Sequence, residues 1–283
     1  MLVNMNDILI PAQKHSYGVG FFNAVNVEMA RAVIETAEEL NSPVMIGTAE
    51  VLLPVTKMEY VLDYLLPMAE AASVPVCVHY DHALTFKQCM KALRLGFTSV
   101  MYDCSMAGYE ENEAQVAEMV RICHSMGVTV EGELGHVGDN EGEGKLLRPE
   151  DYYTDPDTAE DYVRRTGVDS LAIAVGNAHG DYKFPPKLDF DRIETIRDRT
   201  RIPLVLHGGS GLSDDDFRTA ISKGICKVNI FTDIDKAGKR GIEKGLAEGA
   251  TSMCGLIPYE IDEMKAVVKE KICLFGSVDK ANR

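Results

Sequence analysis

Short apolar runs alternate with stretches of helical periodicity along almost the whole chain. Most of the runs are predominantly apolar, which is typical of buried strands. The runs predict strands at residues 18–24, 43–47, 75–80, 99–102, 128–133, 170–175, 203–206 and 226–230. The stretches between them predict helices, the clearest at residues 27–40, 57–72, 86–95 and 111–126.

This succession of strand-then-helix units favours a parallel barrel of the TIM (β/α)8 type. Single glycines stand where a helix passes into the next strand and support regular short connections, at Gly96, Gly127, Gly167 and Gly224. An open, doubly wound sheet is the alternative, but no glycine-rich dinucleotide loop follows the first strand.

No linker, repeat or low-complexity tract divides the chain, so a single barrel domain over residues 1–283 is predicted. Two segments depart from the regular alternation. Residues 135–157 follow the fifth strand and are rich in glycine and acidic residues, and a connection this long predicts a mobile lid. An amphipathic helix at about residues 260–276 is expected to pack on the barrel or on a neighbouring subunit.

The composition argues against several classes of partner. A formal net charge of -15 argues against nucleic acid and anionic membranes, and no apolar run approaches the roughly 20 residues that cross a bilayer. The start of the chain lacks the basic and apolar regions of a signal peptide. The Cys count of 7 is odd and has no Cys-x-x-Cys spacing, which indicates reduced thiols and a cytoplasmic protein.

Three of the predicted strands end in a histidine: His82, His179 and His207. One histidine at such a position is as often a hydrogen-bonded structural residue as a ligand. Active sites of TIM barrels, however, lie at the carboxyl ends of the strands, where all three would meet. Neutral imidazole is the commonest zinc ligand, and three protein ligands with one open position are typical of catalytic zinc. The histidines therefore predict a metal site at one mouth of the barrel.

Carboxylates accompany these histidines. Asp81 directly precedes His82, so strand pleating would aim the two side chains to opposite sides unless the strand ends there. Asp81 is expected to handle the proton of a substrate hydroxyl, and the alternative is that it orients a histidine. Asp103 and Glu133 end the fourth and fifth strands, where they would bind a second cation, hold the ligands or form ion pairs.

Glycines beside two of the histidines predict a phosphate site. Gly208, Gly209 and Ser210 follow the seventh strand, in a region where barrels often hold phosphate. Glycine lets backbone N–H groups approach an anion closely, although ordinary turns use the same residues. The residues expected to complete this site are Gly180, Lys183, Asn229 and Thr232.

Five motifs together resemble those of the class II, metal-dependent fructose-bisphosphate aldolase family, which includes tagatose-bisphosphate aldolases. They are Asp81-His82, Glu131-Gly132-Glu133-Leu134-Gly135, Asn177-Ala178-His179-Gly180-Asp181-Tyr182-Lys183, Leu206-His207-Gly208-Gly209-Ser210-Gly211 and Asn229-Ile230-Phe231-Thr232-Asp233. The similarity covers almost the whole chain. It implies a zinc-dependent TIM barrel enzyme that cleaves a ketose 1,6-bisphosphate, with fructose 1,6-bisphosphate expected first. The products would be dihydroxyacetone phosphate and glyceraldehyde 3-phosphate.

The resemblance also implies a set of metal ligands. His82, His179 and His207 match the family's zinc ligands. Asp103 and Glu133 match acidic residues near an alternative metal position. A homodimer or homotetramer is expected.

Further residues match positions that act on or bind the substrate. Asp81 matches the carboxylate that moves the hydroxyl proton, and Glu141 matches the lid carboxylate that exchanges the proton on the ketone-side carbon. Asn23 and Asn229 match substrate-contacting amides. A monovalent cation, Na⁺ or K⁺, often sits near one phosphate, and the positions around that phosphate are matched by Gly180, Lys183, Gly208, Ser210 and Thr232.

Two departures from the family pattern bear on the lid and the substrate. The lid reads Gly138-Asp139-Asn140-Glu141-Gly142, so it keeps the glutamate but lacks the acidic residue that usually follows. Phe231 stands where fructose-type members carry Asp and tagatose-type members a small residue such as Ala. A tagatose bisphosphate or another phosphorylated ketose is therefore the alternative substrate.

Three other functions compete with this interpretation. A Schiff-base aldolase needs a lysine at a strand end, and Lys227 is the residue nearest to that description. A zinc hydrolase on the same barrel typically has His-x-His after the first strand, and residues 18–26 contain no histidine. A binding protein that has lost its catalytic activity is disfavoured, because the three expected histidine ligands are present together with Asp81 and Glu141.

Overall fold

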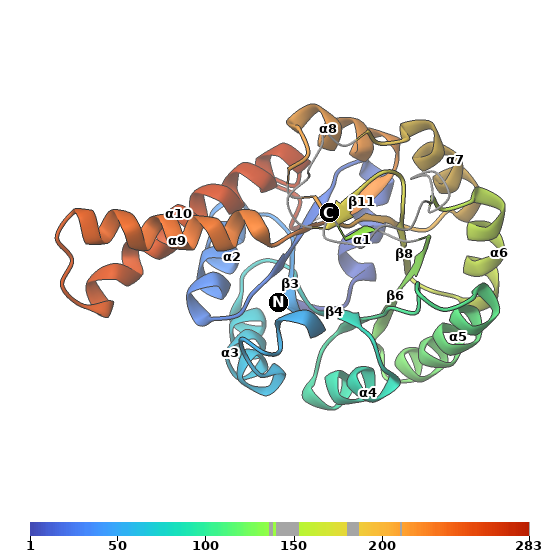
Figure 1. The fold of residues 1–283 in the computed structure, drawn as a ribbon, viewed down its shortest axis with the longest axis horizontal. Helices are drawn as coiled ribbons and strands as arrows, with labels where there is room; N and C mark the ends of the chain where they lie inside the picture. The colour runs from blue at the N-terminus through green and yellow to red at the C-terminus, as the bar shows by residue number, and fades with distance from the viewer. Residues whose placement is uncertain (136–137, 140–152, 180–186, 210, 283) are drawn as a thin grey trace.

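Parallel strands form a closed barrel in the computed structural model, which describes residues 1–135, 138–139, 153–179, 187–209 and 211–282 (Figure 1). The strands follow the order β4-β3-β2-β11-β10-β8-β6-β5, and pairing of β5 with β4 closes the ring, so the predicted TIM barrel is confirmed. The barrel strands are β2 (Val19–Asn23), β3 (Val44–Ala49), β4 (Val76–Ala83), β5 (Ser99–Tyr102), β6 (Thr129–Leu134), β8 (Ser170–Ile173), β10 (Leu204–Leu206) and β11 (Ile225–Ile230).

Helices between the strands cover the outside of the barrel (Figure 1). Their ends follow local sequence signals: the Thr85 side chain accepts a hydrogen bond from the Gln88 N–H at the start of α4, and Gly96 ends this helix with φ +102°. The helices are α2 (Val27–Glu39), α3 (Met58–Ala71), α4 (Phe86–Leu95), α5 (Tyr109–Ser125), α6 (Pro156–Thr166), α7 (Phe190–Thr200) and α8 (Asp214–Lys223), and a 3-10 turn, η1 (Glu50–Leu52), follows β3.

The N-terminal segment closes the bottom of the barrel, and the sequence did not predict it. The short strand β1 (Leu2–Val3) pairs with the start of β4, and helix α1 (Asn6–His15) follows it. Pro11 and the polar residues around it obscure the helical period. This segment joins the lower interior of the barrel in one apolar cluster, made of Met5, Ile8, Leu9, Ala12, Tyr17, Val19, Phe21, Met45, Cys77 and Cys226.

Polarity inside the barrel changes along the strand direction. On β4 the inward positions pass from Cys77 to His79 and then to Asp81, all buried. On β6 they pass from Thr129 to the buried carboxylates Glu131 and Glu133. Because all the barrel strands are parallel, the polar ends meet at the same mouth.

The C-terminal part of the chain extends beyond the barrel as a pair of packed helices (Figure 1). They are α9 (Thr232–Ala247) and α10 (Met253–Phe275). The predicted start of the last helix at about residue 260 was wrong, because α10 begins at Met253 and continues through Pro258. Close contact with α9 supports this first part: a Cβ added at Gly241 would lie 2.3 Å from the carbonyl oxygen of Tyr259.

Four further observations concern a second small sheet, the predicted lid, the cysteines and the helices. Two short strands, β7 (Gly138–Asp139) and β9 (Ala178–His179), pair in parallel and form a separate two-stranded sheet. Most of the predicted lid, residues 136–137 and 140–152, lies outside the described residues. All seven cysteines are free, and five of them are buried. None of the helices in the described residues has the length and apolar character needed to cross a membrane.

The close approach of β3 to β4 predicts that Gly47→Ala destabilises the barrel. A Cβ at Gly47 would lie 1.7 Å from the carbonyl oxygen of His79, which is backbone and cannot rotate away. The free energy of unfolding should fall by at least the roughly 1–3 kcal/mol that overpacking costs, measured by denaturant titration. Gly255→Ala in α10 is the control, because its new Cβ meets no atom closer than 3.5 Å and the variant should be neutral or stabilised. Wild-type stability of Gly47→Ala would contradict this packing.

Candidate metal centre

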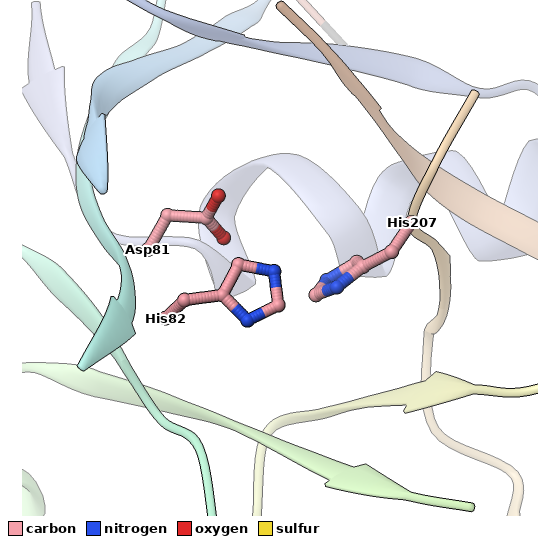
Figure 2. Close-up of side chains that lie close together, drawn as sticks. All are labelled: Asp81, His82 and His207. Atoms are coloured by element: carbon pink, nitrogen blue, oxygen red, sulfur yellow. The ribbon is translucent and has the colours of Figure 1, made fainter. Parts of the chain in front are cut away.

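Two of the three predicted histidine ligands converge at the carboxyl-terminal mouth of the barrel. The rings of His82, on β4, and His207, directly after β10, lie with centroids 4.6 Å apart at an angle of 72°. Figure 2 shows the two rings pointing toward each other, with the Asp81 carboxylate beside them. Each of these three residues offers a ligand atom, and the atoms lie within 4.8 Å of one another. Three histidines were expected to meet here, and the described side chains bring two of them together with Asp81 as a third potential ligand.

A local backbone irregularity allows Asp81 and His82 to face the same site. The strand does not end at Tyr80 as predicted, and regular pleating would separate the two side chains. The register of β4 against β5 shifts between Tyr80 and Ala83, and His82 has φ +46°. A left-handed conformation at a non-glycine residue costs about 1–3 kcal/mol and is concentrated at functional sites. The bulge therefore turns His82 toward the interior beside Asp81.

Asp103 orients His82. Its Oδ2 lies 2.7 Å from Nδ1 of His82, and its Oδ1 accepts hydrogen bonds from the N–H and hydroxyl of Ser105. Burial opposes ionisation, but the hydrogen bond and charge of His82 hold the pKa of Asp103 well below its usual range. With Glu133 these two residues also form a second group of potential metal ligands. Holding a ligand was one of the roles expected of Asp103.

Two glutamates contact the ring of His207. The Oε1 atom of Glu131 lies 2.8 Å from Nε2, and Oε2 of Glu133 lies 3.3 Å from Nδ1. Burial lowers the pKa of His207, but these carboxylates outweigh burial and raise it to about 10. At its backbone, the His207 carbonyl accepts a hydrogen bond of 3.0 Å from the Asn177 side-chain amide. His207 is thus held at both ends.

Two amides hold the carboxylate of Asp81. The Nδ2 of Asn23 donates to Oδ2 at 3.1 Å, and the Nδ2 of Asn229 donates to Oδ1 at 3.2 Å. Although burial favours the neutral acid, the charges of His82 and Lys227 lower the pKa of Asp81 to about 2. The residue is 2% exposed and lines the pocket at this mouth. An ionised carboxylate fixed in this way is suited to accept a proton from a bound molecule.

Glu131 and Lys227 are site residues to which the sequence analysis gave no role in metal binding. Both are fully buried, with Nζ of Lys227 2.9 Å from Oε2 of Glu131. Lys227 lies inside β11 and not at its end, so it is not placed as a Schiff-base lysine. The sequence did contain a signal for Glu131. It is a charged residue within an apolar strand, two positions before Glu133 and on the same strand face.

A pocket at the same mouth brings together most of the remaining predicted residues that are described. Gly209 packs tightly at its edge, because a Cβ there would lie 3.0 Å from the carbonyl oxygen of Asn229. Thr232 is the first residue of α9, so the N-terminus of this helix reaches the pocket. The pocket is lined by Asn23, Ala49, Val51, Leu52, Asp81, His82, Gly208, Gly209, Asn229, Ile230, Phe231 and Thr232.

Several predicted site residues are not placed by the structure. His179 belongs to β9, but only its backbone is described. The others that lie outside the described residues are Glu141, Gly180, Lys183 and Ser210.

The donor atoms that are described fit a zinc ion. Imidazole nitrogen and carboxylate oxygen are both zinc ligands, and a mixed set of this kind suits a divalent transition metal better than calcium or magnesium. Burying several carboxylates close together is costly unless cations compensate them. Asp81, Asp103 and Glu133 therefore make this mouth of the barrel favourable for a cation.

Comparison with known proteins gives a consistent result. The sequence model of the family described as "Fructose-bisphosphate aldolase class-II" matches residues 3–280. The uncharacterized protein YdjI of Escherichia coli (strain K12) is 41% identical over 271 residues, 95% of each chain. A fructose-bisphosphate aldolase of Geobacillus stearothermophilus is 39% identical over 289 residues, 99% of each chain. The crystal structure of the YdjI aldolase from E. coli K12 matches with a TM-score of 0.90 and 37% identity, covering 100% of both chains.

Removal of one imidazole should reduce metal binding. His207→Ala is expected to lower the zinc content of purified protein well below that of the wild type, measured by atomic emission, because an inward-facing donor is lost. His15→Ala is the control, since His15 is exposed at the end of α1 and its loss should leave zinc content unchanged. Equal zinc in the wild type and His207→Ala would contradict the ligand assignment.

Proposed function

Because the chain belongs to the class-II fructose-bisphosphate aldolase family, we propose that it is a zinc-dependent aldolase that cleaves fructose 1,6-bisphosphate. Aldolase activity follows from membership of this family, whereas the substrate and the roles of individual residues are proposed. The products are dihydroxyacetone phosphate and glyceraldehyde 3-phosphate, and the reaction is reversible. The observation that carries the proposal is the convergence of His82 and His207 beside an ionised Asp81 at one barrel mouth.

His82, His207 and His179 are the proposed zinc ligands. The first two are supported by their convergence, and His179 is supported by its place in β9 and by its family motif. A bound Zn²⁺ would polarise the substrate carbonyl and stabilise the negative charge that develops on the ketone side during cleavage. Asp103 and Glu133 are proposed at the alternative metal position, since both lie in a group with His82.

Asp81 is the proposed acid–base residue for bond cleavage. In the cleavage direction it accepts the proton of the hydroxyl next to the breaking carbon–carbon bond, and in the reverse direction it returns that proton. The amides of Asn23 and Asn229 keep both carboxylate oxygens in place while the carboxylate gains and loses the proton. Glu141, in the segment after β6, is proposed to exchange the proton on the ketone-side carbon.

One phosphate of the substrate is proposed to bind beside the N-terminus of α9. Helix N-termini and glycine-rich turns present backbone N–H groups to anions. Thr232 and Gly209 line the pocket there. The residues proposed for this site are Gly180, Lys183, Gly208, Gly209, Ser210, Asn229 and Thr232, with a monovalent cation, Na⁺ or K⁺, near the phosphate.

Phe231 is proposed to select the sugar. It lines the pocket together with the apolar residues Val51 and Leu52 from the segment after β3. A bulky ring restricts which hydroxyl configuration fits, and this makes tagatose bisphosphate or another phosphorylated ketose the alternative substrate. A cytoplasmic homodimer or homotetramer is also proposed, and the seven free cysteines support the cytoplasmic location.

Asp81→Asn should abolish most turnover without removing the metal. The amide keeps the shape of the side chain but cannot accept the hydroxyl proton, so kcat should fall about 100-fold or more, measured by coupling triose phosphate release to NADH oxidation. Zinc content should stay at the wild-type level. Asp215→Asn, on the exposed surface of α8, is the control and should retain full activity. Wild-type kcat for Asp81→Asn would rule out the proposed role.

Phe231→Ala should change the preference between ketoses. Wild-type and variant proteins are assayed with fructose and tagatose bisphosphates, and the ratio of the two kcat/KM values should change about 10-fold or more, the scale of a pocket contact. Tyr60→Ala, an exposed aromatic on α3, is the control. An unchanged ratio would remove Phe231 as the selecting residue, and no cleavage of either sugar by the wild type would refute both proposed substrates.

A further inference from the structure

Glu131 and Lys227 form a buried ion pair one level below the candidate metal centre. Nζ of Lys227 lies 2.9 Å from Oε2 and 3.2 Å from Oε1 of Glu131, and both side chains are fully buried. The ammonium group also lies 4.6 Å from the ring centroid of Phe21. Replacing such a pair by apolar residues is often neutral or stabilising, so stability alone does not explain it. Its position points to a role in the site above.

The pair fixes the ring of His207 through one of its two nitrogens, Nε2. An ammonium group can only donate, so Glu131 acts as an acceptor toward Lys227. The same Oε1 lies 2.8 Å from Nε2 of His207, and an ionised carboxylate has no hydrogen to offer. The hydrogen in this contact must therefore come from Nε2. The other nitrogen, Nδ1, lies 3.3 Å from Oε2 of Glu133, which forms a group of potential metal ligands with His82 and Asp103.

The position of the pair separates it from the substrate. Glu131 precedes Glu133 by two residues on β6, and Lys227 precedes Asn229 by two residues on β11, so each lies one interior level below the mouth. The pocket that Asp81 and Asn229 line includes neither residue. Glu131 reaches the candidate metal centre through its contact with Nε2 of His207, and it also lies in a group of potential ligands with His79 and Asp81.

We propose that Glu131 and Lys227 are positioning residues for metal binding. Glu131 holds Nε2 of His207 in a hydrogen bond, so that Nδ1 is the nitrogen left to face a metal ion. Lys227 holds the Glu131 carboxylate in this orientation by contacting both of its oxygens. The inference rests on the proposed function, because it takes His207 as a zinc ligand.

The test compares Glu131→Leu, Glu131→Gln and Lys227→Met with the wild type. Affinity for Zn²⁺ is measured by competition with a chromophoric chelator, and ¹⁵N-histidine NMR of the zinc-loaded proteins reports which nitrogen of His207 is coordinated. Glu131→Leu should weaken zinc binding about 10- to 100-fold, the scale found for lost partners of metal ligands, and should lose the hydrogen-bonded Nε2–H signal. Glu131→Gln keeps an acceptor oxygen and should lose less affinity. Glu260→Gln, a buried glutamate on α10, is the matched control and should change neither measurement.

The possible results separate failure of this inference from failure of the proposed function. Coordination of His207 through Nε2 in the wild type, or wild-type zinc affinity in folded Glu131→Leu, would overturn the inference while leaving the aldolase proposal intact. If Glu131→Leu does not fold, wild-type affinity in both Glu131→Gln and Lys227→Met would overturn it equally. Failure of the wild type to bind zinc would instead refute the proposed function, and this inference with it.

Discussion

The structure depends on the compensation of charge inside a closed barrel. Asp81, Glu131 and Glu133 are each at most 2% exposed, and Asp103 lies beside them, so carboxylates are concentrated where water cannot solvate them. Such groups are tolerated only with hydrogen-bond donors and cations in contact. Imidazoles, amides and one buried lysine supply part of that compensation. The surplus of acceptors is what makes the mouth suitable for a divalent cation.

The barrel concentrates this chemistry at one end because its other end is filled. Helix α1 and the lower strand positions form an apolar cluster, whose members include Met5 and Phe21. Above it, inward-facing side chains become polar on several strands at the same height, since parallel strands bring their carboxyl ends together. The result is a rigid base under an ionisable layer. Rigid support is what a metal centre needs to hold its ligands in place.

Within that layer, some side chains hold the candidate ligands and Asp81 in place by hydrogen bonds. Asp103 and Glu131 each contact a ring nitrogen of one histidine, and the amides of Asn23 and Asn229 hold Asp81. These contacts leave Asp81 ionised at the pocket and the two rings directed at a common point. A metal-dependent aldolase uses this combination, in which a cation near the carbonyl stabilises the developing charge and a base near the hydroxyl accepts its proton.

The sequence alone determined the barrel, because alternating apolar and helical periods are local properties of the chain. It also determined that His82 and His207 stand at the carboxyl ends of barrel strands, whereas His179, expected at the end of a barrel strand, belongs to β9 in a separate two-stranded sheet. It did not predict α1, the early start of α10, the shared orientation of Asp81 and His82, or the role of Glu131 with Lys227. Each of these depends on contacts between residues distant in sequence: Lys227 meets Glu131 only when β11 and β6 curve around the same interior. Only closure of the barrel decided which buried charges would meet, because pairing energy exists only between groups that the fold brings within a few ångströms.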